Sequence, residues 1–314
     1  MKRHVILLFA LIIAICTSQA AEIQKSTHIY DITTDGDTLR LDRYTSGDKT
    51  SPNPVVIFAF GGSFRTGSRD AKDYLQYFEF LATEGYDVVS IDYRTKMAGF
   101  NPAGGITGFV TSLQDAITAA VEDMLKATAF IISKSDDWNI NPTAIIASGS
   151  SAGAITALQA ENLISASGTP SFLPSGFNYA GVVTFAGAVC AAGAPSWNAE
   201  RLCPMLMFHG DVDTTVPFKK AEAMGFGLYG SQFISDQLNE MKVPHELYII
   251  NQADHSVAVT PMKNNLYDIL SFLHEFVDQR SDRVTIVNQS KPGAPKDYNT
   301  DFSIMDYVTS NMPR

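Results

Sequence analysis

Apolar runs of strand length, separated by segments with helical spacing, constrain the fold of this chain more than any other feature. Residues 54–60 (PVVIFAF) form one continuous apolar run, which suits a strand buried on both faces of a sheet. Residues 70–84 follow with apolar side chains at helical spacing, and residues 86–93 (YDVVSIDY) are expected to form the next strand. Strands that alternate with helices of this length predict an α/β fold, with a mostly parallel central sheet covered by helices on both faces.

The same alternation continues along the chain, and it predicts a sheet of about eight strands. Further strands are expected over 28–34, 38–44, 143–148, 180–187, 204–209 and 245–250, the last of which ends the sheet. Further helices are expected over 112–134, 151–163, 217–225, 231–241 and 260–279. Asp35 and Gly36 predict a tight hairpin turn between the first two strands. Because no repeat or linker divides the chain, we expect one catalytic domain over 22–280 and a C-terminal tail over 281–314.

The first 21 residues have the pattern of a signal peptide. A short basic start precedes an apolar run of 12 residues, Val5–Cys16, and small residues follow it. A membrane-spanning helix needs about 20 apolar residues, so we expect export to the periplasm or the medium and no integral membrane anchor. Lipid attachment at Cys16 is disfavoured, because the bulky Ile15 precedes it.

The charge and the cysteines set further expectations. A formal net charge of −10 disfavours nucleic-acid binding, because phosphate backbones are recognised by basic surfaces. Two cysteines follow the leader, Cys190 and Cys203. Export permits a disulfide between them, and the alternative is two buried thiols that pack as small hydrophobic groups. No Cys or His spacing indicates a zinc site.

Residues 149–153 (GSSAG) match the pattern G-x-S-x-G. An apolar strand precedes them and an alanine-rich helix follows, which is the context of a nucleophile elbow. This turn is so sharp that side chains at Gly149 and Gly153 would clash with neighbouring elements, and its strain holds the serine oxygen clear of the sheet. Ser151 is therefore the candidate nucleophile. A plain helix start capped by Ser150 or Ser151 is the alternative interpretation.

A serine hydroxyl needs a base to become a nucleophile. Of the six histidines, five follow the leader: His28, His209, His245, His255 and His274. His255 lies in a polar loop after the strand over 245–250 and before the last helix. Where a nucleophile elbow is present, the base comes last in the chain and lies on such a loop. His255 is therefore the candidate base.

Residues 209–217 (HGDVDTTVP) follow a predicted strand and contain the candidate acid. Their pattern H-G-x-x-D-x-x-V-P resembles the acid loop of the α/β-hydrolase superfamily, in the branch of dienelactone-hydrolase-like, prolyl-peptidase-like and bacterial feruloyl or acetylxylan esterase-like proteins. The resemblance implies that Asp213 orients the imidazole and stabilises its protonated form, with Asp211 as the alternative. Asp254 is discounted, because a sequence neighbour of the histidine does not usually reach its far ring nitrogen. His209 is expected to be structural.

The same resemblance implies an oxyanion hole. Residues 60–64 (FGGSF) occupy the place of the His-Gly-Gly-Gly motif of esterases and lipases, with Phe60 in place of the histidine and Ser63 in place of the third glycine. Backbone N–H groups carry the function, so these departures need not abolish it. The expected donors are the N–H groups of Gly62 or Ser63 and of Ala152. The alternative interpretation of the two glycines is an ordinary turn.

The resemblance covers roughly residues 50–279. It includes Val89–Arg94, in which Asp92, Tyr93 and Arg94 are interpreted as architectural. It implies a serine hydrolase that cleaves esters through an acyl-enzyme. Because the sequence shows no long lid insertion, the expected substrates are short or medium acyl esters, carbohydrate-linked acetyl or feruloyl groups included. This mechanism requires no cofactor and no metal.

Two other functions are compatible with the same motifs. One is a peptidase of the prolyl-peptidase type, although such enzymes usually carry an additional domain. The other is a non-catalytic binding module, although such modules typically lose a member of the triad. Two segments, 95–110 and 164–178, are expected to overhang the site. Their phenylalanines line a substrate pocket or pack the loops: Phe100, Phe109, Phe172 and Phe177.

Overall fold

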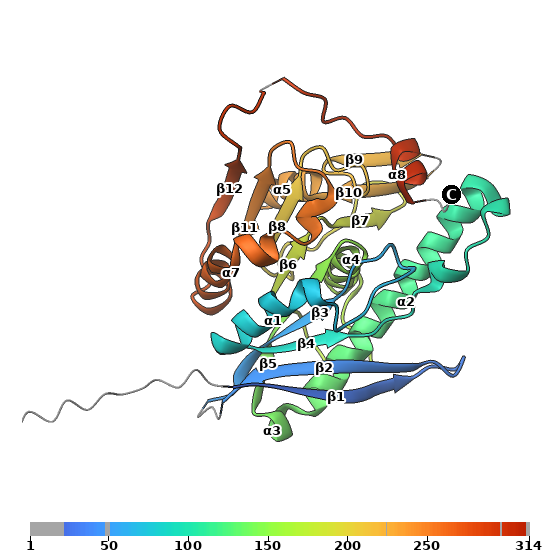
Figure 1. Cartoon of the computed structure of the whole chain (residues 1–314). Coiled ribbons are helices and arrows are strands. Elements are labelled where there is room, and N and C mark those ends of the chain that lie inside the picture. The colour runs from blue at the N-terminus through green and yellow to red at the C-terminus, as the bar shows by residue number, and fades with distance from the viewer. Residues whose placement is uncertain (1–21, 48–50, 224, 296, 312–314) are drawn as a thin grey trace, which may run out of the picture.

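A nine-stranded sheet forms the centre of the molecule in the computed structural model (Figure 1). The model describes residues 22–47, 51–223, 225–295 and 297–311, and the expected signal peptide lies outside them. The strands of this sheet are β1 (Ile23–Ile32), β2 (Thr38–Ser46), β3 (Asn53–Ala59), β4 (Asp87–Ile91), β5 (Ile140–Ser150), β6 (Gly181–Phe185), β8 (Met205–Gly210), β11 (His245–Ile250) and β12 (Val284–Gln289).

The sheet is mostly parallel, as the alternation of strands and helices predicts. Its strand order is β1-β2-β4-β3-β5-β6-β8-β11-β12. The predicted hairpin of β1 and β2 is antiparallel, β2 is antiparallel to β4, and every later pair is parallel. Strands β3, β4 and β6 are largely or wholly buried, which explains the consecutive apolar residues at the centre of each strand.

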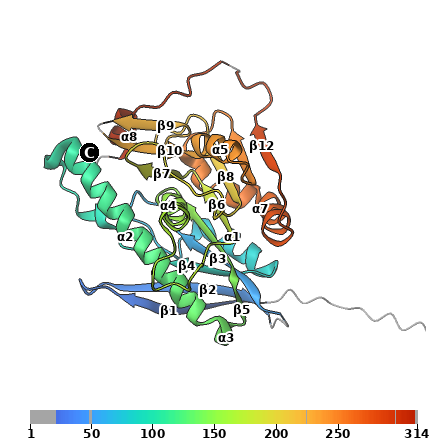
Figure 2. The same cartoon turned by 180° about the vertical axis from the view of Figure 1, so that it is seen from behind.

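Helices cover both faces of this sheet. The α-helices of the described residues are α1 (Lys72–Thr83), α2 (Gly105–Ser133), α3 (Ser135–Trp138), α4 (Ala152–Ser167), α5 (Ser231–Glu240), α6 (Pro261–Asn264), α7 (Leu266–Phe272) and α8 (Ile304–Asn311), of which α8 lies against a second sheet. Helices α1 and α7 lie in front of the sheet in Figure 1, whereas α2 lies in front of it in Figure 2. Within the described ranges, no helix combines the length and apolar character that a bilayer span requires.

A second, three-stranded sheet overturns one predicted helix. It consists of β7 (Ala188–Ala191), β10 (Phe226–Gly230) and β9 (Lys220–Ala223), in the order β7-β10-β9. The helix predicted over 217–225 is therefore wrong. Lysine, alanine and glutamate favour helices, but antiparallel pairing with β10 overrides this local preference. The period of two is visible in the exposure, since Ala221 is buried between the exposed Lys220 and Glu222.

Two other helix boundaries differ from the prediction. The expected helix over 260–279 is divided at Asn265 into α6 and α7, and a π-helix (Leu273–Asp278) continues α7. Helix α2 begins at Gly105, so it takes in part of the segment that was expected to overhang the site. Short 3-10 helices, Lys96–Gly99 and Pro102–Gly104, occupy most of the rest of that segment.

The chain after residue 280 contributes more than a tail. The expectation that 245–250 is the last strand is wrong, because β12 pairs in parallel with β11 and adds an edge strand. Its side chains alternate between exposed and half-buried, and residues 284–287 (VTIV) are all β-branched, a strand signal that the interpretation of this segment as a tail overlooked. The chain then runs along the same side of the molecule as the second sheet and ends in α8 beside β9 (Figures 1 and 2).

A buried carboxyl group, Glu161 of α4, lies within the core. Its Oε1 accepts hydrogen bonds from the Cys203 backbone N–H at 3.1 Å and from the Asn178 side-chain amide at 3.4 Å. Its Oε2 has no hydrogen-bond partner among the residues the model describes. Burial raises the pKa of Glu161 to about 7. Cys190 and Cys203 are free thiols, and burial raises the pKa of both.

The buried Glu161 is expected to make folding stability depend on pH. Its folded-state pKa exceeds the ordinary value, so between pH 4.5 and 7 the unfolded chain releases this proton before the folded one. The free energy of unfolding should fall by about 3 kcal/mol across that window and then stay level. Glu161→Gln should remove this component, whereas the exposed Glu240→Gln should retain it. Urea unfolding at pH 5, 6, 7 and 8 measures the slope, and equal slopes for wild type and Glu161→Gln would contradict the assignment.

Candidate active site

Ser151 lies at the turn between β5 and α4. Its backbone is in the left-handed region, with φ of 51°, a strained conformation that proteins retain at functional sites. A side chain at Gly149 would overlap the backbone of Gly153, and one at Gly153 would overlap the carbonyl of Ala59. The steric reason inferred for both glycines is therefore confirmed.

Ser151, His255 and Asp213 come together in one hydrogen-bonded chain. Asp213 Oδ2 lies 2.7 Å from His255 Nδ1, and His255 Nε2 lies 2.8 Å from Ser151 Oγ. An ionised carboxylate only accepts, so Nδ1 carries the proton and Nε2 is left to accept the serine hydroxyl. This is the tautomer that a general base requires.

The loop after β8 holds Asp213 as a charged acceptor. Asp213 Oδ1 accepts the backbone N–H groups of Thr215 at 2.8 Å and Val216 at 3.0 Å. Burial alone would raise the pKa of Asp213, but the hydrogen bonds from His209 and His255 outweigh it and hold the pKa well below its usual range. The carboxylate therefore stays ionised when the imidazole becomes protonated.

His209 is in a structural position. Its Nε2 donates to the carbonyl of Val216 at 3.2 Å and lies 3.5 Å from Asp213 Oδ2. Its Nδ1 accepts the hydroxyl of Ser231 at 2.8 Å. The ring is fully buried, so it braces the acid loop from the side away from solvent.

The two other carboxylates that were weighed have different partners. Asp211 accepts the Gln252 backbone N–H at 2.6 Å and also bonds the Tyr298 hydroxyl. Asp254 is exposed and caps the 3-10 helix His255–Ala258 by accepting the N–H of Ser256. Neither carboxylate bonds the imidazole in the described structure, whereas Asp213 does.

Sequence analysis missed a contact made by Ser150. This serine is buried, and its hydroxyl donates to the carbonyl of Ala258 at 2.8 Å. The bond fastens the nucleophile turn to the short helix that carries His255. Position 150 is variable in the G-x-S-x-G pattern, so the motif gave no signal for it.

The glycine-rich loop after β3 lies against the nucleophile. A side chain at Gly61 would come within 3.2 Å of Ser151 Cβ. Gly62, Ser63 and Phe64 all have positive φ, of 131°, 54° and 55°. The Arg65 N–H donates to the Gly62 carbonyl at 2.9 Å, so residues 62–65 form a tight turn of left-handed backbone. Ala152 is the first residue of α4, and a backbone N–H at that position has no partner within the helix.

Phe60 has a packing role. Its ring stacks on Tyr93 with the centroids 4.4 Å apart, and the Tyr93 hydroxyl donates to the Phe60 carbonyl at 2.7 Å. The Gly61 N–H donates to the Tyr74 hydroxyl at 3.0 Å. These contacts hold the start of the loop and leave the N–H groups of Gly62 and Ser63 as the candidate oxyanion donors.

The residues interpreted as architectural make ion pairs and hydrogen bonds away from the triad. Asp92 pairs with Arg69 at 2.9 Å, and Arg94 pairs with the buried Asp123 at 2.7 Å. With the Tyr93 hydroxyl bond, these contacts fix the chain just after β4.

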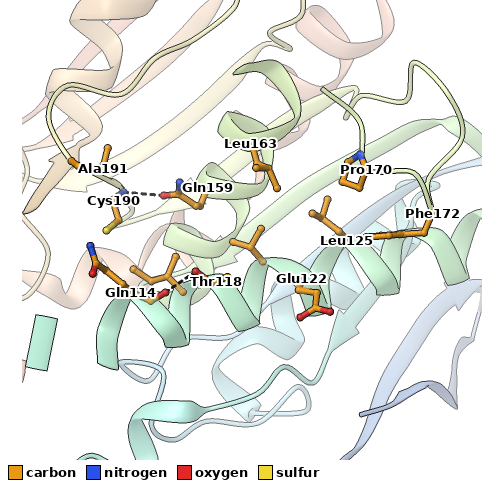
Figure 3. A pocket seen from close by; sticks show the side chains of 13 residues that line it. Gln114, Thr118, Glu122, Leu125, Gln159, Leu163, Pro170, Phe172, Cys190 and Ala191 are labelled. Atoms are coloured by element: carbon orange, nitrogen blue, oxygen red, sulfur yellow. Dashed lines mark hydrogen bonds between the residues drawn. The ribbon is translucent and has the colours of Figure 1, made fainter. Parts of the chain in front are cut away.

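A separate cavity of about 530 Å³ lies between α2 and α4 (Figure 3). Its lining is mainly apolar, with Leu125, Leu163 and Phe172 among the side chains, and it includes none of the triad residues. Phe109 is buried and packs edge-to-face on Phe100 at 5.5 Å. Of the four phenylalanines expected near the site, Phe172 therefore lines this cavity and Phe109 packs the core.

Solved structures place this architecture in a known class. An esterase from the Planctomycetes species Thermogutta terrifontis, with propionate bound, is 19% identical with a TM-score of 0.58, over 82% of this chain and 94% of that one. Esterase 2 of the same species, phosphorylated by paraoxon, is 19% identical with a TM-score of 0.56, over 82% and 94%. This chain has the α/β-hydrolase fold.

The sequence comparisons cover a smaller part of the chain than the structural matches do. The model of the BD-FAE family matches residues 41–164. That range runs from β2 into α4 and holds the glycine-rich loop and Ser151, but neither Asp213 nor His255. No curated protein matches the chain.

Proposed function

We propose that the protein is a serine ester hydrolase that works through an acyl-enzyme. The single observation that carries this proposal is the chain of two short hydrogen bonds from Asp213 through His255 to Ser151. The esterases of similar fold and the BD-FAE match across the nucleophile support the same activity.

The geometry assigns a role to each group. His255 Nε2 takes the hydroxyl proton while Ser151 Oγ attacks the ester carbonyl carbon. The carbonyl oxygen becomes an oxyanion, which accepts hydrogen bonds from Ala152 and from Gly62 or Ser63. His255 then gives its proton to the departing alkoxide, which leaves Ser151 acylated. In the second half of the reaction His255 takes a proton from water, which attacks the acyl carbon. The serine oxygen leaves with the proton from His255, so the carboxylic acid is released and the serine hydroxyl is restored.

The proposed substrates are short or medium acyl esters, including acyl groups carried on carbohydrates. This sequence has no long lid insertion, which favours dispersed esters over emulsified fat. The leader pattern in residues 1–21 supports a site of action outside the cytoplasm.

A fluorophosphonate probe tests the proposal. Purified protein without its leader should gain one adduct by intact mass, and peptide mapping should place it on Ser151. His255→Ala should abolish labelling, because without the base the hydroxyl is not activated. His274→Ala is the matched control, since this histidine is exposed and bonds no member of the triad in the described structure; it should label like wild type. Folded wild-type protein that takes up no probe would overturn the proposal.

A further inference from the structure

The last turn of α8 brings one side chain into contact with two loops of the site. Asn311 is buried, with 8% of its surface exposed. Its Oδ1 accepts the hydroxyl of Ser63 at 3.1 Å, and its Nδ2 donates to the carbonyl of Thr215 at 3.0 Å. Ser63 belongs to the candidate oxyanion loop, and Thr215 donates its own N–H to Asp213. One amide therefore ties the oxyanion loop to the acid loop.

Packing fixes the helix that carries this amide. Tyr307 and Val308 of α8 are buried, and the Tyr307 ring meets Phe109 of α2 edge-to-face at 6.1 Å. Figures 1 and 2 both show α8 beside β9. Asn311 Nδ2 also donates to the Tyr307 carbonyl at 2.9 Å, which orients the amide on its own helix.

The oxyanion loop needs such support because its backbone is strained. Ser63 and Phe64 are consecutive non-glycine residues in the left-handed region, and each such conformation persists only where its surroundings hold it. Arg65 adds a bond from its guanidinium to the Asn311 carbonyl at 3.4 Å. The end of α8 thus contacts this loop at both Ser63 and Arg65.

We propose that Asn311 is a positioning residue for the oxyanion hole. It fixes the conformation of Ser63, so that a backbone N–H of this loop points to where the ester oxygen gains its charge. Such a contribution acts in the transition state, and it acts through Ser63 without touching the substrate. This inference rests on the proposed ester hydrolase function.

A double-mutant cycle on p-nitrophenyl acetate hydrolysis tests it. Asn311→Ala and Ser63→Ala should each lower kcat by about 10- to 100-fold, with KM changed by less than about twofold. The double variant should be no slower than the slower single variant, because both remove the same hydrogen bond. Inhibition by a short trifluoromethyl ketone, which forms an oxyanion when bound to the serine, should weaken by the same factor as kcat.

A control separates positioning from loosening of the helix. Val308→Ala removes buried packing from α8 without touching Ser63, and its kcat should stay within about twofold of wild type. Multiplicative losses in the double variant, an unchanged ketone affinity, or an equal loss in Val308→Ala would each overturn the inference. If the wild type hydrolyses esters and Asn311→Ala has the same kcat, only this inference is overturned. If the wild type neither hydrolyses esters nor takes up the fluorophosphonate probe at Ser151, the proposed function itself is overturned.

Discussion

Replacement of Ser151 by alanine is expected to lower kcat for short p-nitrophenyl esters by about a millionfold. The hydroxyl is the group that His255 activates at 2.8 Å, and no acyl-enzyme forms without it. The remaining rate comes from substrate binding and the oxyanion hole, which accelerate the direct attack of water. Steady-state hydrolysis of p-nitrophenyl acetate measures the loss.

The fold should survive this substitution. Alanine at position 151 must adopt the same left-handed backbone as the serine, so the strain is similar in both proteins and Tm should change by only a few degrees. Ser150→Ala is the matched control within the same pentapeptide. It removes the bond to Ala258 but keeps the nucleophile, and kcat should fall by no more than about tenfold. Full turnover by folded Ser151→Ala would rule out the assignment of the nucleophile.

Local patterns predicted the centre of the fold and failed at its edges. Residues 54–60 are apolar without interruption, because most of them form β3 inside the sheet. Strand β4 is equally buried, although its segment 86–93 also contains Asp87 and Ser90. Strand β12 lies at the edge of the sheet with half-exposed side chains, and its β-branched residues 284–287 were overlooked because a polar segment with prolines follows them. Strand β9 is built of good helix formers, and pairing with β10 decides its conformation.

The residues of the candidate site also fall into those that the sequence predicted and those that it did not. Ser151 and His255 were proposed from local context and chain order, and Asp213 from the resemblance of its loop to a known acid loop; the structure joins the three by hydrogen bonds. Asn311 carried no such signal, because it is 248 residues from Ser63 in sequence and lies on a segment expected to be a tail. Contacts of this kind depend on where distant segments meet, and no spacing rule encodes that.

Asp213→Asn tests the acid more sharply than a truncation, because it preserves size and removes only charge and acceptor strength. Asp213 now accepts the proton of His255 Nδ1 at 2.7 Å. An amide that turns its NH₂ toward this nitrogen favours the tautomer with the proton on Nε2, which faces Ser151 and then has no lone pair to accept with. We expect kcat to fall by about 10⁴-fold with little change in KM.

Two other aspartates serve as controls for this prediction. Asp254→Asn keeps the cap on the His255 helix, because asparagine caps helix starts as well as aspartate does; its kcat should stay within about twofold of wild type. Asp211→Asn disturbs bonds to Gln252 and Tyr298 but not the imidazole, so its loss should be far smaller than that of Asp213→Asn. A larger loss at Asp211 than at Asp213 would transfer the role of the acid to Asp211. That result would also mean that the acid loop rearranges when substrate binds, because Asp211 bonds no atom of His255 in the described structure.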